Sequence, residues 1–124
     1  MKETLEELGE YIALSLGKEV LSVAVLHQEL QLEVSRESIA KTLLFLRDDP
    51  NCLFKMLIDI CGVDWPQREE RFEVVYNLLS LKHNQRIRIK LHTDDAVPVP
   101  SMVSVYPAAG WFEREVWDMS VSYT

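Results

Sequence analysis

Charged side chains gather in one short stretch near the C-terminal end of the 124-residue chain. The stretch holds three acids and one arginine within six residues: Glu113, Arg114, Glu115 and Asp118. Two carboxyl groups held close together can act as general acid and general base, so one hypothesis is a small acid–base enzyme that uses Glu113, Glu115 and Asp118. The same residues can equally form a structural ion-pair cluster or, together with Trp111, a docking surface.

Arg114 is the natural centre of such a cluster. A guanidinium carries five donors in a fixed fork and can bind two carboxylates at once. Asp118 lies one helical turn further along the chain, at a spacing that allows an ion pair. Because Trp111 and Trp117 flank Arg114, we expect it to be partly covered, with Asp118 as its main partner. It would then organise the junction of this helix with the rest of the fold or with a partner protein.

Other kinds of catalytic site have little support in the sequence. The three histidines, His27, His83 and His92, are not at metal-ligand spacing with each other or with a cysteine, so no metal site is expected. Four glycines form no phosphate-binding loop, and no flavin or nicotinamide motif is present. Cys52 and Cys61 lie in apolar, strand-like contexts without C-x-x-C spacing, and we interpret them as reduced thiols in the core.

A second group of charged residues forms a cationic row. Arg86, Arg88 and Lys90 alternate with apolar residues, which predicts a strand with the three cations on its outer face. Such a row is either solvated or a docking face for an acidic partner. A nucleic-acid-binding sheet is disfavoured, because the net charge is −7 and no aromatic residues alternate with the cations for base stacking.

Composition restricts the class of protein further. The hydrophobic content of 48% excludes a disordered chain. The longest charge-free runs carry prolines, a glycine and serines, so no membrane-spanning segment and no direct membrane insertion are expected. Acidic residues close to the N-terminus argue against a secretory signal.

The apolar spacing predicts the elements that position these groups. Thr4 and Glu7 form a capping box that begins a helix, and Gly17 is its expected end. Ser35 is expected to begin a second helix that stops before Pro50. The predicted strands cover residues 20–26, 30–34, 54–63, 72–81 and 86–92, and a final helix covers residues 108–119. The order α-β-β-α-β-β-β-α predicts a two-layer α+β fold, with a mixed sheet covered by helices on one face.

Two details of this scheme concern which side chains are buried. Val20–Leu26 is almost wholly apolar and is expected to be a buried strand. In the third strand, alternation places Met56, Ile58 and Ile60 on the inner face.

Five segments of the chain together resemble one protein family. They are Leu57–Asp64, Arg71–Ser80, Asn84–Lys90, Pro100–Val103 and Tyr106–Met119, the last of which contains the sequence Glu-Arg-Glu-Val-Trp-Asp. They resemble the C subunit of proton-pumping NADH:quinone oxidoreductase, respiratory complex I, especially its alphaproteobacterial or mitochondrion-encoded members. The resemblance implies one domain over residues 1–119. Residues 120–124 do not resemble the segment that follows in the family.

The resemblance also implies a function. It implies a cofactor-free structural and assembly subunit in the peripheral arm, on the cytoplasmic or matrix face of the membrane. The flavin and the iron–sulfur clusters would lie on partner subunits. The main partner would be the large subunit that helps to build the quinone site, along with other hydrophilic subunits, and no nucleic acid. The equivalent subunit of a related membrane-bound hydrogenase is an alternative of the same kind.

Overall fold

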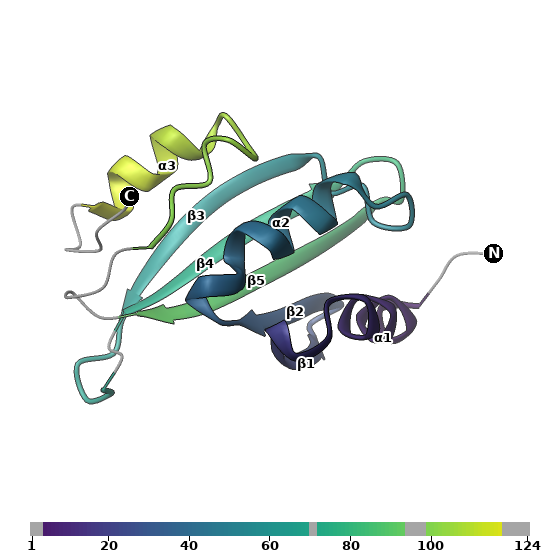
Figure 1. The fold of residues 1–124 in the computed structure, drawn as a ribbon, viewed down its shortest axis with the longest axis horizontal. Coiled ribbons are helices and arrows are strands. Elements are labelled where there is room, and N and C mark those ends of the chain that lie inside the picture. The colour runs from purple at the N-terminus through teal and green to yellow at the C-terminus, as the bar shows by residue number, and fades with distance from the viewer. Residues whose placement is uncertain (1–3, 70–71, 94–98, 118–124) are drawn as a thin grey trace.

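The computed structural model describes residues 4–69, 72–93 and 99–117, with only the backbone of Trp117. Its helices are α1 (Leu5–Leu16), α2 (Ile39–Asp48) and α3 (Ala109–Trp117). Its strands are β1 (Val20–Leu26), β2 (Glu29–Val34), β3 (Met56–Asp64), β4 (Phe72–Ser80) and β5 (Gln85–Thr93). The predicted α+β fold and the order of its elements are confirmed (Figure 1). The predicted end of the last helix, at residues 118–119, lies outside the described residues.

The sheet joins two antiparallel units through one parallel pair of strands. The strand order is β1-β2-β5-β4-β3. Strand β1 pairs with β2, and β3, β4 and β5 form a meander. Strands β2 and β5 run parallel, with Leu30 opposite Ile87 and Leu32 opposite Ile89. This register places the apolar side chains of both units on the same face of the sheet.

Helix α1 begins and ends as its sequence predicts. The Glu7 backbone N–H donates to Thr4 Oγ1 at 3.2 Å, and the Thr4 N–H donates to Glu7 Oε2 at 3.5 Å, which completes the capping box. Gly17 ends the helix at φ +66°, a conformation that glycine adopts without strain. Leu8, Ile12 and Leu16 are buried on the face that packs over β1 and β2.

Helix α2 begins three residues later than expected. A 3₁₀ turn over 36–38 follows Ser35, and the hydroxyl of Ser35 hydrogen-bonds to that of Ser38 at 2.8 Å. The helix ends at Asp48, ahead of Pro50 as predicted.

One apolar core lies between the helices and the sheet. The inner stripe of α2 and the inward residues of β4 and β5 are buried as predicted: Ile39, Leu43, Leu46, Phe72, Val74, Tyr76, Leu78, Ile87, Ile89 and Leu91. Each large aliphatic side chain of this kind contributes roughly 1.5–3 kcal/mol by leaving water. The core therefore joins the helices to the sheet, and Figure 1 shows α2 lying across β4 and β5.

The prediction that residues 20–26 form a buried strand is wrong. Strand β1 lies at an edge of the sheet, and most of its residues are exposed. Its apolar composition resembles that of a central strand, but β1 pairs on one side and α1 covers it on one face. Sequence alternation does not show which strand occupies an edge.

The predicted inner face of β3 is also partly wrong. The register shifts between Leu57 and Asp59, which inserts an extra residue into the strand. Leu57 and Ile60 are therefore buried, whereas Met56 is exposed and Ile58 is half-buried. The same register places Cys61 on the opposite, exposed face, so of the two cysteines Cys52 alone is in the core.

The hairpin between β1 and β2 carries backbone strain. Its two turn residues, His27 and Gln28, have φ values of 52° and 64°. Two consecutive left-handed residues are typical of a type I′ turn, in which Asn-Gly is strongly preferred. A non-glycine residue with a long side chain is less stable in this conformation.

We predict that His27→Asn with Gln28→Gly stabilises the protein. Relief of the strain should raise the free energy of unfolding by about 1 kcal/mol, which corresponds to a rise of about 4 °C in Tm. Thermal unfolding followed by circular dichroism measures this. Gln31→Gly in the extended backbone of β2 is the control and should lower Tm. A Tm of the double variant that equals or falls below that of the parent would contradict the strain argument.

Candidate docking surfaces on α3 and on the open sheet face

The carboxylate of Glu113 fastens α3 to the loop that precedes it. The Ser101 hydroxyl donates to Glu113 Oε1 at 2.7 Å, and the Met102 backbone N–H donates to Oε2 at 2.7 Å. Glu113 is 6% exposed. Burial of a carboxylate is unfavourable unless its oxygens accept hydrogen bonds, and here each oxygen accepts one. Glu113 is therefore a structural residue of α3.

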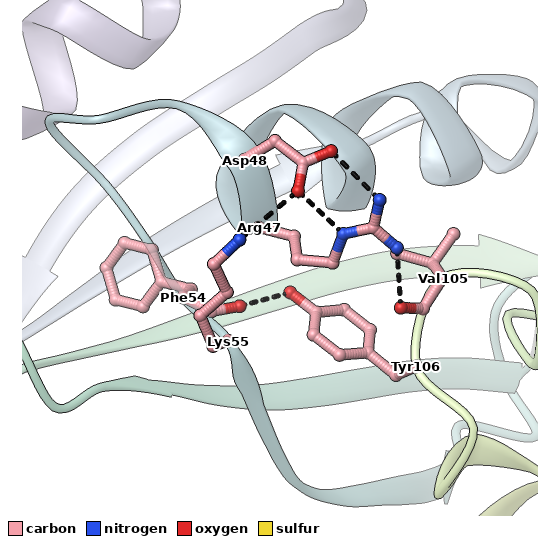
Figure 2. A network of polar contacts seen from close by, with 6 residues as sticks. All are labelled: Arg47, Asp48, Phe54, Lys55, Val105 and Tyr106. Carbon is pink, nitrogen blue, oxygen red and sulfur yellow. Dashed lines mark hydrogen bonds and ion pairs between the residues drawn. The ribbon is translucent and has the colours of Figure 1, made fainter.

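Two hydrogen bonds hold the other end of this loop (Figure 2). The Tyr106 hydroxyl donates to the backbone oxygen of Phe54 at 2.5 Å, and Arg47 Nη1 donates to the backbone oxygen of Val105 at 2.9 Å. Burial raises the pKa of Tyr106, since the phenolate would lose its hydration. These bonds tie the loop to α2 and to the segment that leads into β3.

Asp48 orients the arginine of this network. Arg47 Nε and Nη2 donate to the two Asp48 oxygens at 2.8 and 2.9 Å, and Lys55 Nζ reaches Oδ1 at 3.3 Å. The hydrogen bond from Arg47 lowers the pKa of Asp48 to about 2, and the Lys55 ammonium acts in the same direction. The bidentate pair fixes the plane of the guanidinium, so that its remaining nitrogen points at Val105 (Figure 2).

An exposed surface results from this anchoring. Trp111 is 65% exposed and Val103 is 45% exposed, and Arg114 and Glu115 are exposed as well. A Cβ added to Gly110 would lie 3.5 Å from Val103 Cγ2, so the loop packs directly on the start of α3. We call Val103, Trp111, Arg114 and Glu115 the α3 surface. A large exposed tryptophan among charged groups is typical of a protein-binding site.

The structure separates the residues that the sequence grouped together. Ala109, Glu113 and Val116 share the inner stripe of α3, at spacings of four and three residues. Arg114 is exposed within the described residues, and its expected cover by Trp117 or by a partner stays a prediction. Asp118 and the side chain of Trp117 lie outside the described residues, as does the expected ion pair of Arg114.

Sequence analysis did not identify Tyr106 and Arg47 as anchors of this surface. Nothing in the spacing of Arg47, Phe54 and Val105 indicates that they meet, because these contacts span more than 50 residues of chain. The sequence does contain a signal for the burial of Glu113. Its spacing from Ala109 and Val116 places the acid on the apolar stripe of the helix.

The face of the sheet opposite the helices carries a polar row across four strands. Its members are Glu29, Arg88, Asn77 and Asp59. Arg88 Nη2 lies 3.8 Å from Glu29 Oε2, and Arg88 Nε donates to Asn77 Oδ1 at 3.2 Å. Asn77 Nδ2 in turn donates to Asp59 Oδ1 at 2.5 Å. The row links β2, β5, β4 and β3 by side chains as well as by backbone hydrogen bonds.

The predicted cationic row lies on this open face but is largely compensated by acids. Lys90 Nζ lies 3.9 Å from Glu73 Oε1, and Arg88 faces Glu29. Within the described residues Arg86 is exposed and forms no ion pair. Of the three cations, Arg86 is therefore the one available to an acidic partner.

The described residues contain no group of three or more histidine, cysteine or acidic side chains that could hold a metal ion. Partial desolvation of its sulfur and the neighbouring Asp59 raise the pKa of Cys61, although part of the residue is exposed. None of the described helices is both long and apolar enough to cross a membrane.

Comparison with known proteins first defines the class of fold. The chain superimposes with a TM-score of 0.82 on a chain of the membrane-bound sulfane sulfur reductase, an archaeal respiratory membrane complex. The match covers 98% of this chain and 71% of the other, at 25% identity. The fold is thus an α+β domain that also occurs in a respiratory membrane complex.

The family model of the respiratory-chain NADH dehydrogenase 30 Kd subunit matches residues 32–120, and the chain belongs to this family. It is 57% identical over 120 residues to the C subunit of NADH-quinone oxidoreductase from Paramagnetospirillum magneticum, and 56% identical over 117 residues to that from Rhodospirillum rubrum. These matches cover 96% and 94% of the chain but 60% and 55% of the two relatives. The chain therefore spans little more than half the length of these curated relatives. The resemblance inferred from sequence motifs is confirmed.

We predict that Glu113→Gln destabilises the fold. The neutral amide can still accept from the Met102 N–H and donate to Ser101 Oγ, but it replaces two hydrogen bonds to a charged carboxylate with weaker bonds between neutral groups. The loss should be about 1–3 kcal/mol of unfolding free energy, measured by urea denaturation. Glu115→Gln is the matched control on the exposed side of α3 and should change stability by less than about 0.5 kcal/mol. Equal effects of the two substitutions would show that Glu113 is not an anchor.

We predict that the effect of Tyr106→Phe depends on pH. At pH 7 the variant loses the hydrogen bond to Phe54, worth about 0.5–1.5 kcal/mol. The folded-state pKa of Tyr106 is raised, so the unfolded chain releases this proton first, above its ordinary pKa of about 10. The stability of the parent therefore falls further above pH 10, and the deficit of the variant shrinks. A deficit that stays constant from pH 7 to 11 in urea denaturation would contradict this account.

Proposed function

We propose that the chain acts as a cofactor-free, non-catalytic structural subunit in the peripheral arm of an NADH:quinone oxidoreductase. The observation that carries the proposal is the position of Glu113. Glu113 is the buried acid of α3, and its carboxylate binds the loop before this helix, so it is not available for acid–base chemistry. Trp111 of the same helix lies on the surface. The curated relatives are named as the C subunit of NADH-quinone oxidoreductase, which supports assembly into such an enzyme.

The arrangement of the acids favours docking over acid–base catalysis. Glu113 faces the core with both oxygens occupied, whereas Glu115 is exposed on another side of the helix. A general acid and a general base must both reach one substrate. These two carboxyl groups diverge, so the described residues of α3 do not form such a pair.

We assign the principal contact to the large subunit that helps to build the quinone site, with other hydrophilic subunits as further partners. Trp111 and Val103 provide apolar area, and Arg114 and Glu115 provide charges at its margin. Arg86 provides a second contact to an acidic group. The flavin and the iron–sulfur clusters would lie on those partners, and the chain would sit at the cytoplasmic or matrix face of the membrane.

A related membrane complex other than NADH:quinone oxidoreductase is the second candidate. The fold shared with the sulfane sulfur reductase chain favours it. The identity to that chain is 25%, against 57% to the Paramagnetospirillum magneticum relative, and therefore the NADH-linked enzyme is the proposal we put first.

We predict that Trp111→Ser with Arg114→Glu impairs assembly without unfolding the chain. Both side chains are exposed, so Tm should change by no more than about 2 °C. Co-purification of the large quinone-site subunit from host membranes and NADH:quinone activity should fall together, by about tenfold or more. Leu14→Ser, at an exposed position of α1, is the control and should assemble as the parent does.

Arg86→Glu tests the second contact within the same experiment. This single substitution is preferable to reversal of the whole row, because Arg88 and Lys90 face Glu29 and Glu73 within the chain. Normal assembly of both the α3 variant and the Arg86 variant would overturn the proposed docking. Full assembly with lost activity in Glu115→Gln would instead favour a catalytic role for this chain.

A further inference from the structure

The outer edge of β1 has few of the features that protect sheet edges. The strand contains no charged residue and no proline from Val20 to Leu26. Leu21 is 59% exposed and Leu26 is 50% exposed. No strand of the described residues pairs with its outer edge. Edge strands usually carry lysines, prolines or covering elements, because their unpaired N–H and C=O groups bind other strands. The irregularity in β1 is confined to its beginning, between Val20 and Ser22.

A groove runs along this edge beside α1. It has a volume of about 550 Å³ and is lined by Glu6, Gly9, Glu10, Ala13 and the segment 23–25. A Cβ on Gly9 would lie 2.9 Å from Val23 Cγ1 and 3.1 Å from Leu30 Cδ1, so α1 approaches the strands closely at this point. The helix thus covers the inner face of β1 and leaves the edge itself open.

We propose that the β1 edge binds an extended, basic segment of a partner protein as an added strand. Half of the N–H and C=O groups of β1 point away from β2 and would supply the main-chain hydrogen bonds. The groove supplies specificity. Glu6 and Glu10 lie one turn apart on α1 at its rim, with no cation among its lining residues. They favour lysine or arginine side chains on the incoming strand.

Charge argues against a second copy of this chain as the occupant. Pairing of two β1 edges about a two-fold axis would bring the Glu6 and Glu10 of both copies to one interface. Each copy also carries a net charge of −7, so the approach of two copies is unfavourable.

The two faces of β1 predict the pattern of the bound segment. Val23 and Val25, opposite Leu32 and Leu30, face α1, whereas Ser22 and Ala24 face the open side of the sheet. A strand added beside β1 would therefore place alternate residues next to Glu6 and Glu10, and the others next to small side chains. The segment should alternate basic residues with small apolar ones. This inference extends the proposed role in assembly. The observations behind it, an unpaired strand edge and an acidic groove, do not depend on that role.

The test uses the full chain and three labelled nine-residue peptides. One alternates lysine and valine, one alternates glutamate and valine, and the third is the lysine–valine peptide N-methylated at four consecutive central residues. Fluorescence anisotropy at low salt should show binding of the first peptide alone. Hydrogen exchange of residues 21–26 should slow on binding, while that of β3 stays unchanged.

Charge variants separate recognition from general attraction. Glu6→Gln with Glu10→Gln should weaken binding of the lysine–valine peptide about three- to tenfold. Glu37→Gln with Glu69→Gln removes the same charge from exposed positions outside the groove and should leave the affinity unchanged.

Four results would overturn the proposal: no binding, equal binding of the N-methylated peptide, equal loss in both double variants, or self-association of the chain through β1. None of them bears on assembly through the α3 surface, which Trp111 and Arg114 test separately.

Discussion

The parallel pairing of β2 with β5 is the constraint on which the rest of the fold depends. It joins a hairpin from the first third of the chain to a meander from the middle. Its register places Leu30 beside Ile87 and Leu32 beside Ile89 on the helix face, and Glu29 near Arg88 on the open face. A shift by one residue would exchange the two faces of β2 and bury its acids. The same pairing leaves β1 and β3 as the edges of the sheet.

The loop before α3 shows how a few buried polar contacts create an exposed surface. Glu113, Tyr106 and Arg47 each direct a polar group at a backbone atom of another segment. Such bonds are more stable in a partly dry environment than in water, and loss of one partner leaves the other unsatisfied. The loop is therefore held at both ends, and Val103 lies against the start of α3 beside Trp111. The exposed positions of this surface are ordered before any partner binds.

Sequence patterns predicted those features that local chemistry decides. The capping box of α1, its end at Gly17, the inner stripe of α2 and the alternation of β4 and β5 depend on residues within a few positions of each other. Two features depend on distant contacts and were not predictable in this way: the edge position of β1 and the extra residue in β3. The burial of Glu113 has a local signal in the spacing of α3, but the loop residues that bind its carboxylate do not. Local spacing gives a residue's neighbours on its own element, but it does not give the elements that pack against it.

The order of the strands also determines how many neighbours the domain can contact. Helix α3 packs against β3, at the edge opposite β1, and the two lie on opposite sides of the molecule in Figure 1. A protein bound at Trp111 therefore does not occlude the β1 edge. Between them the open face is largely charge-compensated, because Arg88 and Lys90 already face Glu29 and Glu73. The ion pairs of Arg88 and Lys90 thus join neighbouring strands of the sheet, whereas the exposed apolar side chains of Leu21 and Trp111 lie towards its two edges. A domain with this distribution is suited to link two different neighbours.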